Sequence, residues 1–249
     1  MDADHFAGAS AAILYTKMSS PQLRVGLERG VEGRSLAWAL NFPGVFAYGN
    51  SDAKALEALP QVFADFEIWL GQRSRTSRLP LANLEIPVEE SFDVILTDEN
   101  YPVNAFFEDD RYPLDAEEIE NAAKIHSWQR QDLLAGVKDP EPELMTRMLP
   151  GQRWNINGIL NHIGRTEIRY LYKLNLPLPR EDLLVHNPFK ILELSYGIVQ
   201  KALPGLEGNT RVVDVDGELW SARKLLRRRL WHQRDHIEHI QQIVEMADQ

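Results

Sequence analysis

The segment Trp231–Ile240, WHQRDHIEHI, decides how the carboxy-terminal half of this chain is interpreted. It lies in an uninterrupted helical pattern that extends from about Glu218 to Met246. His232 and His236 are four residues apart, so on an α-helix both imidazoles leave the same face, one turn apart. Two neutral imidazoles placed in this way can hold one divalent transition metal if a third ligand comes from elsewhere. The segment therefore predicts a helix that carries two ligands of a metal site.

Helical patterns with short connections fill the chain after Pro113, and we expect an antiparallel four-helix bundle over residues 113–249. The patterns cover Asp115–Val137, Asn155–Leu174, Pro188–Leu203 and Glu218–Met246, with a short helical piece at Leu144–Leu149. Bundles commonly house metal sites between facing helices. The third ligand is therefore expected on the inward face of another of these helices.

His162 is the candidate for this third ligand. Leu160 and Ile163 flank it, and the stripe to which it belongs faces inward in the predicted bundle. An imidazole in such a place needs a partner. The spacing fits a metal site formed by His162, His232 and His236. It fits equally well a core histidine bonded to a carbonyl, with the other two on a solvated face.

Two phrases of this half, ILNHIGRTE at residues 159–167 and SARKLLRRRLWHQRDHIEHI at residues 221–240, resemble the DinB-like superfamily of metal-binding four-helix bundles. The resemblance covers about residues 113–247. In that family one histidine of the second helix and a His-x-x-x-His pair of the fourth hold the metal, which implies His162, His232 and His236 as ligands. Imidazole ligation suits zinc or nickel first, with iron and copper as further possibilities.

Other residues close to the predicted site are candidates for catalytic work. Arg228 lies one turn before His232 on the same face and could hold an anionic substrate group. Glu167 could orient an imidazole or accept a proton, although at five residues from His162 it points well round the helix.

The remaining histidines and arginines of these helices are given less weight. His239 is expected to point outward rather than to serve as a fourth ligand, and His126 is expected to stay out of the site. Arg227 and Arg229 are interpreted as solvated or as members of ion pairs.

Three histidine ligands leave an open coordination position, which is typical of catalytic metal sites. The resemblance implies a metal-dependent hydrolase or a thiol S-transferase, in which the metal activates water or a low-molecular-weight thiol cosubstrate. The chain has no cysteine, so a thiol would arrive on a small-molecule substrate. The alternative is a non-catalytic binding or stress-response module that the metal only stabilises. Four protein ligands, His239 included, would favour that module.

The amino-terminal half has strand-like alternation followed by a helical pattern. Strands are expected at residues 22–27, 36–40 and 45–48, and a helix at Ala53–Leu70 with a break or kink at Pro60. The phrase FPGVFAYGNSDAKALEALP, residues 42–60, resembles HicB-type antitoxin domains. The overall expectation is an α+β chain, with a HicB-like α/β domain at residues 1–112 before a DinB-like bundle at residues 113–249.

The amino-acid composition limits the kinds of partner that this protein is expected to bind. The net charge of −10 argues against nucleic-acid binding, because neutralising phosphates requires a basic surface. No apolar run is long enough to span a membrane, and the first residues lack the pattern of a secretory signal. A cytoplasmic location is expected, and the large apolar bundle faces favour a homo-oligomer, most simply a homodimer.

Overall fold

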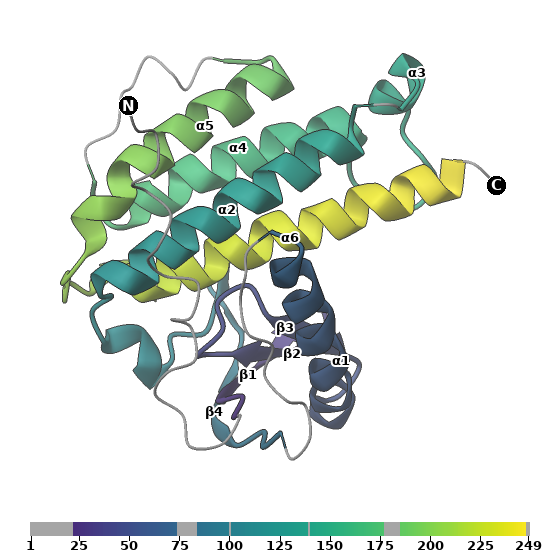
Figure 1. Ribbon diagram of the computed structural model, residues 1–249. Helices are drawn as coiled ribbons and strands as arrows, with labels where there is room; N and C mark the ends of the chain where they lie inside the picture. The colour runs from purple at the N-terminus through teal and green to yellow at the C-terminus, as the bar shows by residue number, and fades with distance from the viewer. Residues whose placement is uncertain (1–21, 74–83, 100, 139, 177–184, 248–249) are drawn as a thin grey trace, which may run out of the picture. The chain divides into compact units, whose positions relative to one another are not determined.

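A computed structural model describes residues 22–73, 84–99, 101–138, 140–176 and 185–247. The chain divides into two compact units, Met1–Val94 and Ile95–Gln249 (Figure 1). The first holds a small sheet with one helix and the second is mainly helical, so the predicted α+β class is confirmed.

The first unit is a sheet of order β3-β2-β1-β4 with helix α1 packed on β2 and β3. Its elements are β1 (Val25–Val31), β2 (Arg34–Ala39), β3 (Phe46–Gly49), α1 (Asp52–Gly71) and β4 (Val88–Asp93). β1 pairs antiparallel with β2 and parallel with β4. The hairpin between β1 and β2 turns through Gly30, Glu32 and Gly33, all of which have positive φ.

Helix α1 is held to the sheet by one apolar face. Leu59, Phe63 and Phe66 are buried on it. Ser51 caps the first turn by accepting a hydrogen bond from the backbone of Lys54. The helix runs through Pro60, so the break that the sequence analysis allowed there, as an alternative to a kink, does not occur. Buried residues stand on both sides of Pro60, so the helix is packed on the sheet where proline removes a backbone donor.

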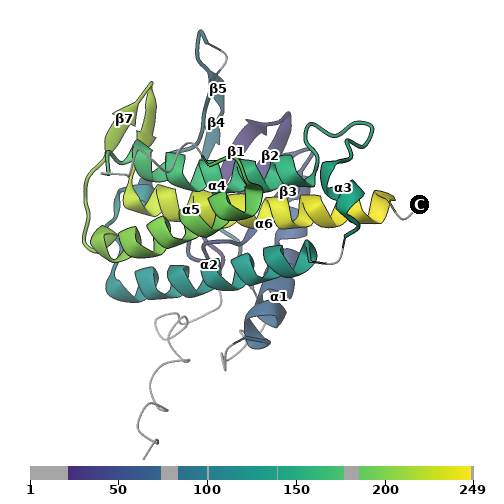
Figure 2. The ribbon, with the colours of Figure 1, turned by 90° about the horizontal axis from the view of Figure 1, so that it is seen from above.

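Four long helices form the second unit, as predicted. They are α2 (Ala116–Gly136), α4 (Ile156–Lys173), α5 (Pro188–Ala202) and α6 (Ala222–Ala247), with the short α3 (Pro142–Thr146) between the first two. The most extensive contacts join α4 to α5, α2 to α6 and α4 to α6. Figures 1 and 2 show the four long helices lying alongside one another. Leu133, Ile159, Ile163 and Ile240 belong to the apolar core between them.

Helix α6 begins later than its pattern suggests. Glu218–Trp220 forms β8, which pairs antiparallel with β7 (Val213–Val215). The turn between them uses positive φ at Asp216 and Gly217. Ser221 then accepts a hydrogen bond from the backbone of Lys224, which caps the first turn of α6.

Residues 95–112, which the sequence assigned to the amino-terminal domain, belong instead to the helical unit. They contain the short strands β5 (Ile95–Leu96) and β6 (Pro102–Val103) and the 3-10 helix η2 (Glu108–Arg111). The physical reason is a set of buried polar contacts with α6. Asp110 is almost fully buried and accepts hydrogen bonds from Arg227 at 2.6 and 3.2 Å.

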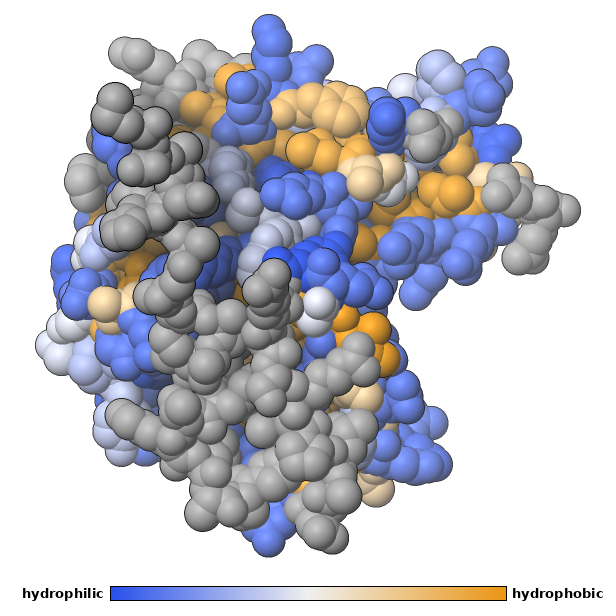
Figure 3. All heavy atoms as spheres, in the orientation of Figure 1, coloured by the Kyte–Doolittle hydropathy of each residue, from blue (hydrophilic) through white to orange (hydrophobic). Residues whose placement is uncertain are grey.

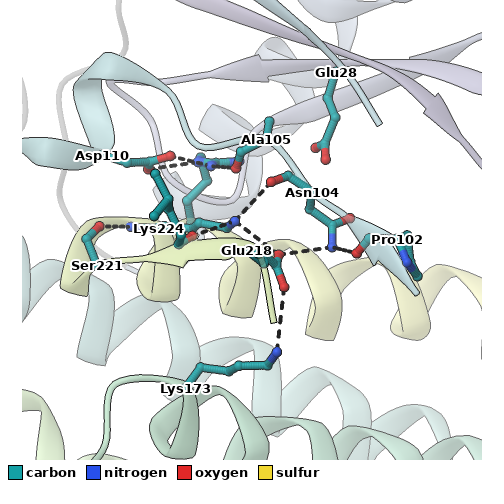
Figure 4. Close-up of polar contacts among 12 residues, drawn as sticks. Glu28, Pro102, Asn104, Ala105, Asp110, Lys173, Glu218, Ser221 and Lys224 are labelled. Carbon is teal, nitrogen blue, oxygen red and sulfur yellow. Dashed lines mark hydrogen bonds and ion pairs between the residues drawn. The ribbon is translucent and has the colours of Figure 1, made fainter. Parts of the chain in front are cut away.

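A second set of contacts centres on the fully buried ammonium of Lys224 (Figure 4). It donates to Glu218 at 3.0 Å and to the carbonyls of Asn104 at 3.0 Å and Leu219 at 2.9 Å. All three protons are thereby used. Burial lowers the pKa of Lys224 to about 8, against the opposing effect of Glu218. Tyr101 adds a further hydrogen bond to Glu218 at 3.1 Å, so one end of the 101–104 segment is tied to β8 and the other, through Lys224, to the first turn of α6.

Among the described residues, no helix has the length and apolar character that crossing a membrane requires.

The buried Arg227–Asp110 pair predicts that two carboxylates of η2, Asp110 and Glu108, contribute unequally to the free energy of unfolding. Asp110→Asn should lower the free energy of unfolding by about 3 kcal/mol or more, because it leaves a buried guanidinium without its counter-charge. Glu108→Gln removes an exposed partner of Arg111 and should cost less than about 1 kcal/mol. Urea unfolding of both variants measures the difference. Equal losses would mean that the buried pair does not anchor this segment.

Candidate metal centre

The structure brings His162, His232 and His236 together between α4 and α6. The ligand nitrogens of the three imidazoles lie within 4.8 Å of one another. Nε2 of His162 and Nε2 of His232 are 2.9 Å apart, and the ring of His236 stands edge-on to both neighbours. His162 and His232 are 70 positions apart in sequence, yet the packing of α4 against α6 brings them into one cluster. The proximity that the sequence predicted for these three residues is confirmed.

Burial keeps all three imidazoles neutral. It lowers the pKa of His162 to about 4 and that of His236 to about 3. Burial, with the neighbouring histidines adding to it, also takes the pKa of His232 well below its usual value. Neutral imidazole is the form that offers a lone pair to a metal. At neutral pH the cluster therefore presents nitrogen donors rather than three mutually repelling cations.

The donor set fits a divalent transition metal. Imidazole nitrogens bound to zinc at about 2.0–2.1 Å stand roughly 3.3 Å apart in a tetrahedral site. Here one pair of nitrogens is 2.9 Å apart and all three lie within 4.8 Å of one another. Nδ1 of His236 is buried and makes no hydrogen bond within the described part of the chain. Such an orphaned nitrogen is costly unless it has a partner. His162, His232 and His236 could thus hold a metal ion, and the identity of that ion is not fixed by the arrangement.

Aromatic rings surround the cluster and leave one side accessible. Trp154 stacks on His162 with ring centroids 4.5 Å apart, and Tyr170 lies edge-on to His232 at 6.0 Å. His232 and His236 are buried, whereas His162 is partly exposed.

The other candidates near the cluster have partners elsewhere. His239 bonds through Nε2 to Gln152 at 2.7 Å and is outside the three-histidine group. The expectation that it is not a fourth ligand agrees with this geometry. Arg228 is buried, not solvated, and its guanidinium lies 4.3 Å over the ring of Trp231.

Glu167 belongs to a separate buried network and contacts none of the three histidines among its described hydrogen bonds. His126 Nε2 donates to it at 2.7 Å, Arg130 donates to both carboxylate oxygens at 2.7 Å, and Ser195 donates at 2.6 Å. Burial acts to raise the pKa of Glu167, but the charge of Arg130, with His126 next, holds it well below its usual value. Glu167 is thus an ionised anchor for α2 and α5 rather than a partner of His162.

Sequence reasoning missed most of this network. His126 and Arg130 are four residues apart on α2, and that spacing was the available signal that both face inward. Gln200 donates to Nδ1 of His126 at 3.2 Å, while Nε2–H of His126 donates to Glu167. These two bonds fix the neutral tautomer. Burial, followed by the charge of Arg229, lowers the pKa of His126 to about 4.

Comparison with protein-family models, curated proteins and solved structures finds no match to this chain. The functional argument therefore rests on the geometry of the site.

The depressed pKa of His126 predicts that the free energy of unfolding falls in acid. Protonation is harder in the folded than in the unfolded state, so the contribution of His126 is fully present above pH 6.5 and is lost as pH falls toward 4. The loss is on the order of 3 kcal/mol over this range. Urea unfolding between pH 7 and 4 should show a shallower pH slope for His126→Gln than for the parent. Identical slopes would contradict a neutral buried His126.

The network also predicts a large effect of removing one charge from it. Glu167→Gln should lower the free energy of unfolding by about 3–5 kcal/mol, because Arg130 and Arg229 then lack a buried counter-charge. The control is Glu193→Gln, an exposed carboxylate on α5, which should change stability by less than about 0.5 kcal/mol. Urea unfolding monitored by circular dichroism compares the two. A small loss for Glu167→Gln would show that the carboxylate is dispensable.

Proposed function

We propose that this protein is a metal-dependent enzyme of the DinB-like superfamily, with a divalent transition metal bound by His162, His232 and His236. The observation that carries the proposal is the convergence of three neutral imidazole donors, two of them buried, from α4 and α6. Zinc and nickel are the ions favoured by such a nitrogen donor set.

When bound, the metal would act as a Lewis acid that lowers the pKa of water or of a small-molecule thiol, and it would so provide a nucleophile near neutral pH. The protein contributes the rest. Under this proposal, substrate would reach the metal beside the partly exposed His162, with the rings of Trp154 and Tyr170 packed against the histidines. We assign to Arg228, one turn before His232, the role of attracting an anionic group of the substrate through its positive charge. Hydrolysis and thiol transfer are both served by this arrangement.

The burial of His232 and His236 is the observation that favours a second candidate, a binding module in which the metal only stabilises the helices. Against it, His239 bonds to Gln152 and does not complete a four-histidine set. The enzyme is therefore preferred. The two candidates differ in whether a small ligand can reach the metal.

The first test is the metal content of protein purified without chelator or histidine tag, measured by mass spectrometry. We expect about one equivalent of zinc or nickel in the parent and its loss in the His232→Ala, His236→Ala double variant. His239→Ala is the matched control, since it removes a histidine of the same helix that is bonded elsewhere, and should keep its metal. Metal retained in the double variant, with its helical circular dichroism intact, would overturn the site.

A second measurement separates enzyme from module. Cobalt substitution of the metal-loaded protein should give visible bands that shift when a small thiol such as 2-mercaptoethanol is added, because an open position admits a new ligand. Bands that stay unchanged at tens of millimolar thiol would favour the stabilised module. His162→Ala should abolish the bands, since it removes the ligand on the accessible side.

A further inference from the structure

A pocket of about 440 Å³ lies between α2 and α5, away from the three histidines. Its apolar wall comes from Leu134, Phe189, Leu192 and Tyr196, and Arg130 and Glu193 supply its charged groups. Leu134 and Phe189 are 43% and 44% exposed, and Figure 3 shows apolar side chains over this face of the helical unit. The volume lies within the range of small-molecule sites.

Arg229 of α6 does not line this pocket, but its guanidinium, which is 1% exposed, interacts with residues that do. None of its three nitrogens makes a hydrogen bond within the described part of the chain, and its ion pair with Glu167 spans 4.0 Å. Arg130 and Tyr196, which interact electrostatically with Arg229, both line the pocket. The field of the orphaned donor Arg229 therefore acts on two residues that line the pocket.

The buried charges around Arg229 do not balance. Arg130 and Arg229 are cationic, Glu167 is the anion that both face, and His126 is neutral, so the group carries one net positive charge. A buried charge without a counter-charge costs several kcal/mol. Glu193 does not offset it, because this carboxylate is exposed and water screens its field, whereas the arginines lie in a medium of low dielectric.

We propose that the α2–α5 pocket binds a small organic carboxylate, with its apolar body on Leu134, Phe189 and Leu192 and its charged end toward Tyr196, Arg130 and Arg229. The Tyr196 ring lies 5.8 Å from the guanidinium carbon of Arg130, and its hydroxyl makes none of the hydrogen bonds described here, so it can donate to the ligand. The carboxylate supplies the missing negative charge. This site is independent of the proposed metal function, since none of the three histidines lines it.

The test compares three probes on the full-length protein: hexanoate, hexanol and hexylamine. They share a six-carbon chain and differ in whether the end group is negative, neutral or positive. Binding is followed by the methyl resonances of leucine, because Leu134 and Leu192 line the pocket. Hexanoate should bind with a Kd of roughly 1 mM, as expected for a ligand of this size, and at least tenfold more tightly than the other two. The titrations are repeated after chelator treatment and should give the same Kd.

Two variants examine the origin of the selectivity. Arg229→Met should reduce the preference for hexanoate over hexanol to less than about threefold, and its urea midpoint without ligand should equal or exceed that of the parent, because an uncompensated buried cation is removed. Leu134→Asp changes an exposed position at the mouth and should weaken hexanoate at least tenfold while leaving the fold intact.

Several results would overturn the proposal. Equal affinity for the three probes would mean an apolar pocket without charge selection, and a preference for hexylamine would mean that Glu193 dominates. Loss of hexanoate binding on chelation would place the carboxylate on a metal instead. A lowered urea midpoint for Arg229→Met would show that its charge is already compensated. If the metal content proves to be zero while hexanoate still binds, the metal proposal fails and this one stands.

Discussion

The carboxylate of Glu167 is the group on which the arrangement of the four long helices depends. It projects from α4 and accepts hydrogen bonds from His126 and Arg130 of α2 and from Ser195 of α5, while Arg229 of α6 pairs with it at longer range. Apolar packing between helices tolerates small shifts in register, but a buried ion with several directed partners does not, because each lost partner exposes it to the full cost of desolvation.

This constraint reaches the three histidines through the helices that carry them. Glu167 lies five residues after His162 on α4, and Arg229 lies three residues before His232 on α6. Arg130, which holds Glu167, also donates to Gln233, the residue after His232 on α6, so directed hydrogen bonds of this network help to set how far α4 and α6 are offset along their axes. The 2.9 Å approach of the two imidazoles is thus maintained by a polar network as well as by core residues such as Ile163 and Ile240.

The helices and the three-histidine cluster could be predicted because their signals are local or repeat with a fixed period. Apolar spacing located α2, α4 and α5 to within a residue or two, and the four-residue interval placed His232 and His236 on one face. The start of α6 could not be predicted, because Leu219 and Trp220 continue its apolar pattern although they form a strand. Glu167 was misjudged for a different reason. Its partners lie on three other helices, and nothing within α4 indicates them.

The polar contacts between residues 101–110 and α6 have a consequence for how this chain can be divided. Arg227 bonds to the carbonyl of Ala105 as well as to Asp110, and Lys224 bonds to the carbonyl of Asn104. A recombinant fragment cut at Pro113, where the helical pattern begins, would remove Asp110 and the Ala105 carbonyl from buried Arg227 and one of the three acceptors from buried Lys224. The smallest segment that can be transplanted, fused or expressed with its own charges satisfied therefore begins near Ile95.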